Sequence, residues 1–140
     1  MAWTAPKTDW AVRLDEDGTY LGDFFEAEDY GRIKGNLQAL CELAAGLYPA
    51  VEMPEIPDIT AESVYDETAA NALEQSLEAL RLETFDPGLP ETKTWRGNDA
   101  APLAEDYNRI EGACLRLYQT LTQQAQARPR LAIILGGVQF

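Results

Sequence analysis

Apolar residues recur along this chain at the spacing of one helix face in three separate segments. The first segment runs from about Glu26 to Leu47, and its apolar positions are Tyr30, Ile33, Leu37, Leu40, Ala44 and Leu47. Steps of three and four residues are typical of an amphipathic helix. Acidic residues in the first turn suit the positive end of the helix dipole, and Pro49 predicts where the helix stops.

Two further segments repeat this pattern. The second helix is expected over about residues 60–84, with Thr60 as its N-cap. Its predicted inner face consists of Val64, Tyr65, Thr68, Ala72, Leu73, Ser76, Leu77 and Leu80. Its other faces, expected in water, carry Glu62, Asp66, Glu67, Glu74 and Glu78. The third helix is expected from about Pro102 to Ala127, closed by Pro129, with an inner face of Leu103, Tyr107, Ile110, Cys114, Leu117 and Leu121.

The remaining segments read as extended chain. "DEDG" at Asp15–Gly18, between short β-prone flanks, predicts a hairpin. The apolar, β-branched ending "RLAIILGGVQF" predicts a strand of about six residues. We therefore expect a mainly α fold with three helices, extended tryptophan-bearing arms and a small β element made by the N-terminal hairpin and the C-terminal strand. Its length predicts a single domain over residues 1–140.

A nine-residue motif occurs twice, as "AEDYGRIKG" at Ala27–Gly35 and "AEDYNRIEG" at Ala104–Gly112. A Lys-Thr and a tryptophan precede each copy, as "KTDW" ending at Trp10 and "KTW" ending at Trp95. This predicts an internal pseudo-repeat, with units at about 7–47 and 93–127 joined by the acidic helix at about 60–84.

The repeated positions are expected to form a duplicated scaffold, comprising Tyr30, Arg32, Ile33, Gly35, Tyr107, Arg109, Ile110 and Gly112. The arginines stand three and four residues after acidic residues, the spacing of helical ion pairs. A mid-helix glycine costs about 1 kcal/mol against alanine, so glycines in register suggest that the two helices cross there. The alternative is an old duplication whose copies no longer touch.

Charge narrows the classes of partner. The net charge is −13, distributed as −4 over residues 1–34, −11 over 35–92 and +2 over 93–140. A strongly acidic chain repels phosphate backbones and anionic lipids, so direct binding to nucleic acid or membrane is not expected. The acidic middle and basic end could meet across a subunit boundary, or the acids could simply solvate a helix.

Little in the sequence points to catalysis. Histidine is absent, and the two cysteines, Cys41 and Cys114, are expected to be buried free thiols. "DEDG" lacks the flanking ligands of a calcium loop, and no pair of carboxylates stands out as catalytic. We expect no enzyme activity, no metal and no cofactor.

The tryptophan arm, the run "FEAEDYGRIKGN" at Phe25–Asn36 and the second "DYNRIE" helix together resemble small tail, baseplate or tail-fibre modules of bacteriophages, prophages and phage tail-like particles. The ending "RPRLAIILGGVQF" is also similar to that group. The chain departs from the family pattern at Gly31, where asparagine is usual, and at Ala113, where the first copy has Asn36. The resemblance implies a structural role in a virion or tail-like particle made in the bacterial cytoplasm.

We therefore expect an assembly protein of the baseplate or tail-fibre attachment region, a homo-oligomer of trimeric or hexameric symmetry that contacts other tail or baseplate proteins. The residues expected at contacts are Trp3, Trp10, Leu131, Ile133, Ile134 and Phe140. Trp10 and Trp95 are also expected to pin their arms onto the helices. Two other classes remain open: an acidic regulatory binder or DNA mimic that inhibits a basic-groove protein, and a tail-assembly chaperone absent from the mature particle.

Overall fold

The computed structural model is built from three helices: α1 (Ala27–Ala45), α2 (Glu67–Glu83) and α3 (Ala104–Ile134). The structure describes residues 3–11, 16–19, 22, 25–48, 52, 55–59, 67–84, 87–97 and 102–134, and the side chains of α3 as far as residue 127. Within these ranges there is no strand. The expected mainly α class is confirmed.

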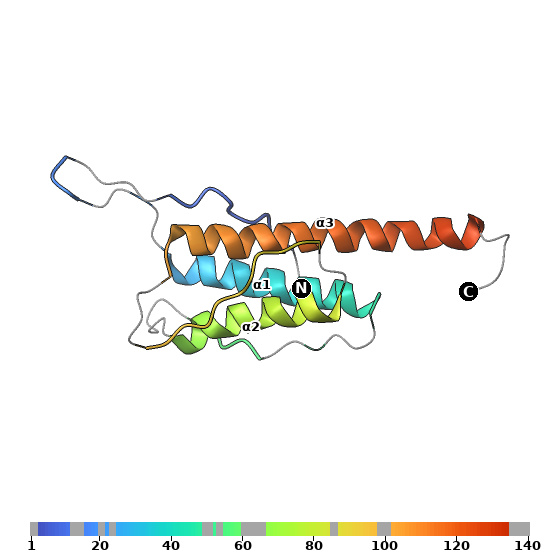
Figure 1. The fold of residues 1–140 in the computed structure, drawn as a ribbon, viewed down its shortest axis with the longest axis horizontal. Coiled ribbons are helices and arrows are strands. Elements are labelled where there is room, and N and C mark those ends of the chain that lie inside the picture. The colour runs from blue at the N-terminus through green and yellow to red at the C-terminus, as the bar shows by residue number, and fades with distance from the viewer. Residues whose placement is uncertain are drawn as a thin grey trace.

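The three helices run in the same direction, side by side (Figure 1). Tyr48, just past the end of α1, donates from its hydroxyl to Gln124 late in α3 at 2.9 Å, as parallel helices require. Short loops would make consecutive helices antiparallel. Here residues 46–66 and 84–103 are long enough for the chain to return along the bundle before each new helix begins.

Two extended segments, residues 3–11 (arm 1) and residues 90–97 (arm 2), lie along the helices and run opposite to them. Arm 1 follows α3 backwards, because Trp3 stacks on Tyr118 whereas Trp10 is bonded to Asn108. Arm 2 follows α2 backwards from Glu78 to Asn71 in the same way. Each arm therefore reaches the end of the bundle at which the next helix starts.

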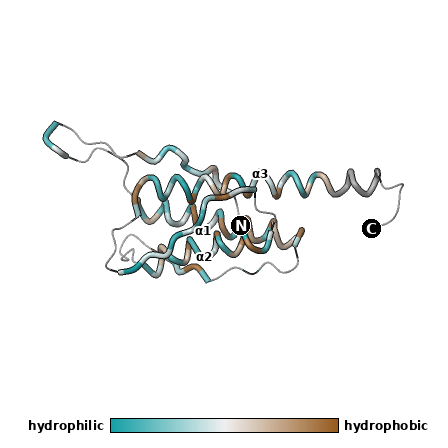
Figure 2. Tube along the Cα trace, viewed as in Figure 1, coloured by the Kyte–Doolittle hydropathy of each residue, from teal (hydrophilic) through white to brown (hydrophobic). Residues whose placement is uncertain are grey.

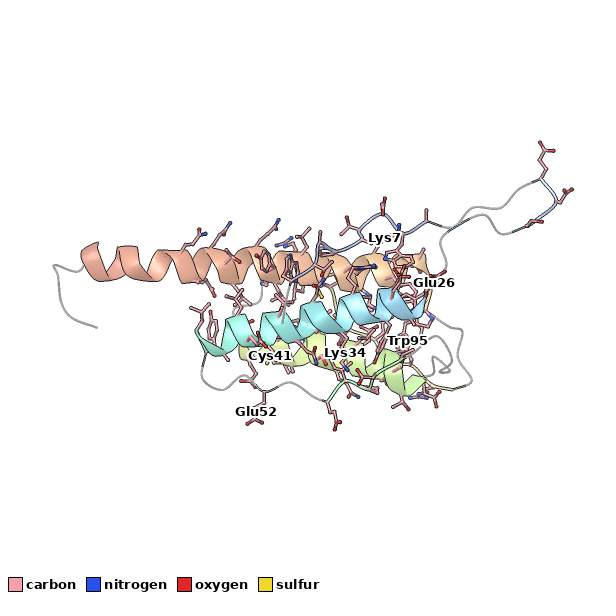
Figure 3. All side chains as sticks on the ribbon, turned by 180° about the vertical axis from the view of Figure 1, so that it is seen from behind. Lys7, Glu26, Lys34, Cys41, Glu52 and Trp95 are labelled. Atoms are coloured by element: carbon pink, nitrogen blue, oxygen red, sulfur yellow. The ribbon has the colours of Figure 1, made fainter. Side chains whose placement is uncertain are left out.

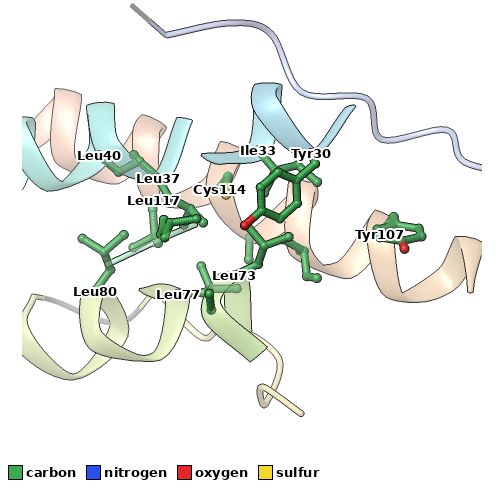
Figure 4. Packing of buried hydrophobic residues seen from close by; sticks show 14 of the residues in the cluster. Tyr30, Ile33, Leu37, Leu40, Leu73, Leu77, Leu80, Tyr107, Cys114 and Leu117 are labelled. Carbon is green, nitrogen blue, oxygen red and sulfur yellow. The ribbon is translucent and has the colours of Figure 1, made fainter. Parts of the chain in front are cut away.

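The core lies among the three helices and takes one face of each (Figure 4). Figure 2 shows apolar positions recurring along each helix, as their spacing predicts. The most deeply buried apolar side chains are Tyr30, Ile33, Leu37, Leu40, Leu73, Leu77, Leu80, Leu117 and Leu121. Burying one leucine or isoleucine stabilises a fold by about 1.5–3 kcal/mol, so this cluster is the main source of stability.

Both repeated motifs begin a helix in the same manner. Asp29 accepts a hydrogen bond from the backbone N–H of Glu26, and Asp106 accepts one from Leu103, each at 2.9 Å. Each aspartate thus satisfies an N–H that the first turn leaves without a helical partner. The aspartate of the motif, rather than the exposed glutamate before it, sets where the helix starts.

The expected C-terminal strand is wrong, because α3 continues through Pro129 to Ile134. Apolar composition alone does not separate a strand from a helix, and the arginine, leucine and alanine around Pro129 favour a helix. Leu135–Phe140 lie outside the described residues, as do Val12, Leu14, Tyr20 and Leu21 of the expected hairpin. The tip of that segment, residues 16–19, is exposed and lies away from the helices (Figure 1).

The expected crossing of α1 and α3 at their glycines is also wrong. A Cβ added to Gly35 or Gly112 would meet no described atom within 4 Å. The physical reason is angular: each glycine follows a buried isoleucine by two positions, which turns it roughly 200° away from the core. The helices pack instead through the apolar face that includes Ile33, Leu37 and Leu117.

Candidate functional site: two buried carboxylates that hold the arms

Glu111 of α3 is the centre of the contacts that hold arm 1. Its side chain is 1% exposed and accepts four hydrogen bonds. Arm 1 supplies two of them, from the backbone N–H of Lys7 at 3.0 Å and from the indole Nε1 of Trp10 at 2.5 Å. Arg32 of α1 supplies the other two, from Nε at 2.8 Å and Nη2 at 2.9 Å. One carboxylate therefore joins arm 1, α1 and α3.

Asn108 completes this site, one helical turn before Glu111. Its Oδ1 accepts the backbone N–H of Trp10 and its Nδ2 donates to the backbone carbonyl of Trp10, both at 2.8 Å. A side-chain amide that binds both polar groups of one residue replaces the partners that a strand would provide. We call Glu111, Asn108 and Arg32 the arm-1 cradle.

Arm 2 is held by the same set of contacts on α2. Glu74 accepts Arg109 Nη1 at 2.7 Å and Nη2 at 2.6 Å, the backbone N–H of Lys93 at 3.3 Å and Trp95 Nε1 at 2.9 Å. Asn71 binds both backbone groups of Trp95, accepting at 2.6 Å and donating at 2.8 Å. We call Glu74, Asn71 and Arg109 the arm-2 cradle. Figure 3 places Lys7 and Trp95 toward the end of the bundle at which the helices begin.

The arginines neutralise the buried carboxylates. The hydrogen bond to Glu111 raises the pKa of Arg32 above its ordinary value, against burial, which lowers it. Burial also lowers the pKa of Arg109, but the hydrogen bonds and charge of Glu74 outweigh it and the pKa rises. Both arginines stay charged at any pH at which the protein folds. Losing one partner of a buried pair typically costs about 3–5 kcal/mol, since the other charge is left uncompensated.

α1 carries the opposite charge at the corresponding position. The two copies of the nine-residue motif differ only where Gly31 matches Asn108 and where Lys34 matches Glu111. Those are the two positions whose side chains on α3 form hydrogen bonds to arm 1. On α1, Lys34 pairs instead with Asp58 of the connector, and Tyr30 donates to the backbone carbonyl of Pro57 at 2.8 Å. The identical positions therefore build the helix, and the differing ones select the segment that lies on it.

The aspartates of the motif support the arginines. Asp29 accepts Arg32 Nη1 at 2.9 Å, and Asp106 lies 3.5 Å from Arg109 Nη2. Asp106 also accepts Lys93 Nζ of arm 2 at 2.7 Å. Burial raises the pKa of Asp106, but the Leu103 N–H and the lysine and arginine charges lower it by more, so the carboxyl titrates below its ordinary range.

Aromatic contacts add to the anchoring of arm 1. The ring of Trp10 lies 5.3 Å from that of Tyr107 and 5.8 Å from that of Phe25, and the latter two stack at 4.0 Å. Trp3 stacks on Tyr118 at 4.2 Å with the ring planes 5° apart. Asn36, itself 1% exposed, binds both backbone groups of Thr4 at 2.8 Å. Arm 1 is thus fixed along its whole length.

The residues expected at contacts fall into three groups. Trp10 is buried in this chain's own core at 6% exposure, and Trp3 packs against the same core. Trp10 and Trp95 anchor their arms on the helices, as expected, because each indole donates to a buried glutamate. Leu131, Ile133 and Ile134 belong to α3, with side chains outside the described part, and Phe140 lies beyond it.

Six of the eight expected scaffold residues lie in the core or at the cradles, whereas Gly35 and Gly112 point away from the core. Tyr30, Ile33, Tyr107 and Ile110 are all buried, and the two arginines bind the carboxylates. The residues that sequence reasoning missed are Asn36, Asn71, Glu74, Asn108 and Glu111. Glu74 was expected in water and is 1% exposed. A signal was present, because Asn-x-x-Glu occurs in both α2 and α3, once for each Lys-Thr-tryptophan arm.

Other chemistry is limited in the described residues. Both cysteines are free thiols; Cys114 is buried as expected, and Cys41 is half-buried. No cluster of three metal-binding side chains is found among these residues. None of the helices, over the parts the structure describes, is long and apolar enough to cross a membrane. No protein-family model, curated protein sequence or solved structure matches this chain.

Proposed function

We propose that this chain is a non-enzymatic structural component of a bacteriophage tail or tail-like particle, in the baseplate or tail-fibre attachment region. The observation that supports a structural role is the use of the two buried carboxylates. Each carboxylate accepts two hydrogen bonds from an arm and two from an arginine of another helix. Such a site stiffens the chain. The assignment to a tail rests on the sequence resemblance.

We further propose that the chain is an internal pseudo-repeat of three units, each an extended segment followed by a helix. The units are arm 1 with α1, the connector 55–59 with α2, and arm 2 with α3. The first unit contributes Arg32 to a glutamate of α3, and the third contributes Arg109 to a glutamate of α2. The connector 55–59 lies against α1, which carries Lys34 where the others carry glutamate. Each extended segment therefore lies on the helix of another unit, in a cycle of three contacts. The contact of the connector with α1 differs from the other two, because it has Lys34 in place of a glutamate.

Assembly would use the part of α3 that extends past α1 and α2 (Figure 1). From Gly112 to Ile134 this helix has no acidic residue and three arginines, whereas most of the chain's acids lie in residues 1–92. A helix end gains little stability from its own hydrogen bonds alone, so a partner packed on this part of α3 would stabilise it. The partners in this proposal are other tail or baseplate proteins and further copies in trimeric or hexameric symmetry, with no direct contact to nucleic acid or membrane.

Quantitative mass spectrometry of purified particles from the producing host tests this role. The expected result is a fixed ratio of this chain to the tail-tube protein, with a copy number of three, six or a multiple. Abundance in the lysate together with absence from particles would contradict the structural role and favour the assembly chaperone or the acidic inhibitor.

Truncation tests the proposed contact at the end of α3. Deleting residues 130–140 should abolish incorporation into particles, because the deleted segment holds Leu131, Ile133, Ile134 and Phe140. The matched control is the substitution of the exposed Leu82 by serine, which should leave incorporation unchanged. Normal incorporation of the truncated chain would show that this contact is not needed.

A further inference from the structure

We propose that arm 1 is exchangeable between copies of this chain, so that the arm-1 cradle of one copy binds residues 3–11 of a second copy. This inference deepens the assembly role proposed above by naming the segment and the site through which copies would be joined. The ligand is an extended peptide that binds Glu111 at two points: through the backbone N–H of one residue and through the indole of a tryptophan three residues later.

The arm-1 cradle has the composition of a site for a linear peptide. Asn108 and Asn36 each bind both backbone groups of one arm residue, which requires an extended chain and no particular side chain. Glu111 and the ring of Tyr107 then select the tryptophan through its indole N–H and its aromatic face. Backbone contacts that give affinity and a pocket that gives specificity are the two parts of peptide recognition by extended segments.

The connection between arm 1 and α1 allows the exchange. Arm 1 precedes α1 and is joined to it through residues 12–24, whereas arm 2 lies between α2 and α3 and is joined to both. The rings of Trp10 and Phe25 are 5.8 Å apart, so this connector starts and ends at nearly the same place. Extended at about 3.3–3.6 Å per residue, it spans roughly 50 Å, enough to reach a neighbouring copy.

Exchange makes the same contacts as the closed chain, so the balance depends on concentration. A tether of this length holds its own arm at an effective concentration in the millimolar range. At low concentration each copy therefore binds its own arm 1. Copies held side by side in an assembly bind one another's arm 1. The exchange would link copies through the contacts between arm 1 and the arm-1 cradle that each single copy already makes.

The charges around the cradle limit where a released arm can bind. On α1 the position that matches Glu111 is Lys34, so that position offers no carboxylate to the indole and carries the same charge as Lys7. The arm-2 cradle is filled by Trp95. The arm-1 cradle of another copy is then the site that fits.

The first experiment uses the full-length Trp10→Ala chain, which loses the anchor of its own arm but keeps Glu111, Asn108 and Arg32. A fluorescent peptide of residues 3–12 is titrated in and its anisotropy is measured. We expect saturable one-to-one binding, at least about tenfold weaker for the same peptide with Trp10→Ala, since the tryptophan is the anchor. The matched control chain is Trp95→Ala, whose arm-1 cradle stays filled; it should bind the peptide as weakly as the wild-type chain does.

The second experiment joins whole chains. Trp10→Ala has a working cradle and no anchor, and Asn108→Ala has a working arm and a weakened cradle. Each alone should be a monomer by light scattering, and their mixture should give a one-to-one dimer. If Trp10→Ala does not fold, as judged by circular dichroism, Lys7→Pro takes its place. It keeps Trp10 but removes the N–H donated to Glu111, together with the Lys7 side chain that pairs with Asp9 and lies over the Trp10 ring.

The exchange is refuted if a folded variant binds neither the peptide nor the second chain up to about millimolar concentration, the range set by the tether. Equal binding of the substituted peptide would also overturn it, because the tryptophan would then play no part. Both measurements use purified chains, so a failure here leaves incorporation into particles as a separate question.

Discussion

The indole Nε1 of Trp10 donates to Oε2 of Glu111 across 101 positions of sequence, at 2.5 Å. This bond ties the beginning of the chain to the helix nearest its end. It also explains why the second copy of the repeated motif has a glutamate where the first has a lysine: only the second receives a tryptophan arm. A substitution that keeps an aromatic ring but lacks the N–H separates the contribution of this hydrogen bond from that of ring packing.

Trp10→Phe should lower the free energy of unfolding by about 1–3 kcal/mol, because Glu111 loses one donor while the aromatic packing is largely kept. Trp95→Phe should cost less, since Trp95 is more exposed than Trp10. Urea denaturation followed by circular dichroism measures both values. Equal and negligible costs would mean that the indole bonds contribute nothing to stability.

Arg32 and Glu111 should behave as one unit in a double-mutant cycle. Arg32→Met and Glu111→Gln should each cost about 3–5 kcal/mol, because each leaves a buried polar partner behind. The double variant should cost clearly less than the two single costs combined, as expected for residues in contact. Strict additivity in chemical denaturation would contradict the pairing.

Gly35→Ala should stabilise the protein by about 1 kcal/mol, because alanine favours a helix and the added methyl group meets no described atom within 4 Å. The control is Gly88→Ala, where φ is +89° and a side chain is strained. Thermal melting should show the first variant above the wild type and the second below it. A large loss for Gly35→Ala would restore the idea of a close contact there.

Asp106 should make stability depend on pH in the acid range. Its pKa is lower in the folded protein than the ordinary value of 3.8. Its contribution is therefore fully present above that ordinary value and is lost as the pH falls through the lower, folded value. Asp106→Asn should flatten this acid limb and lower stability at pH 7, whereas Glu105→Gln, at the exposed neighbour, should leave the limb unchanged. Denaturation at several pH values between about 2 and 6 measures the effect.

The two thiols should react at very different rates. Burial raises the pKa of Cys114 to about 12, and burial also raises that of the half-buried Cys41. Alkylation by iodoacetamide at neutral pH should label Cys41 slowly and Cys114 only after unfolding, since the thiolate is the reactive form. Mass spectrometry of the labelled peptides separates the two sites. Rapid labelling of native Cys114 would contradict its burial.

Local pattern was enough to predict the three helices and most of their inner faces. Two residues expected inside are wrong: Thr68 is exposed, and Leu103 is 56% exposed. The steps of three and four residues located α1 to within about two residues at each end, and they identified Leu73, Leu77 and Leu117 as core. The repeated aspartates were rightly expected in the first turn, and the three-residue spacing of each Asp and Arg was rightly expected to bring them together. These features depend on residues close together in sequence, which is why periodicity and capping reveal them.

The tertiary structure alone decided what the polar residues do. Glu74 and Glu111 look like solvated positions in any local reading, because their partners lie in an arm and a helix far away in sequence. Only the direction of the helices shows that arm 1 runs back along α3 and arm 2 along α2, and that each arm brings its tryptophan to a buried carboxylate. Pro129 is a second case in which local sequence was misleading. It predicts the end of a helix, but α3 continues to Ile134.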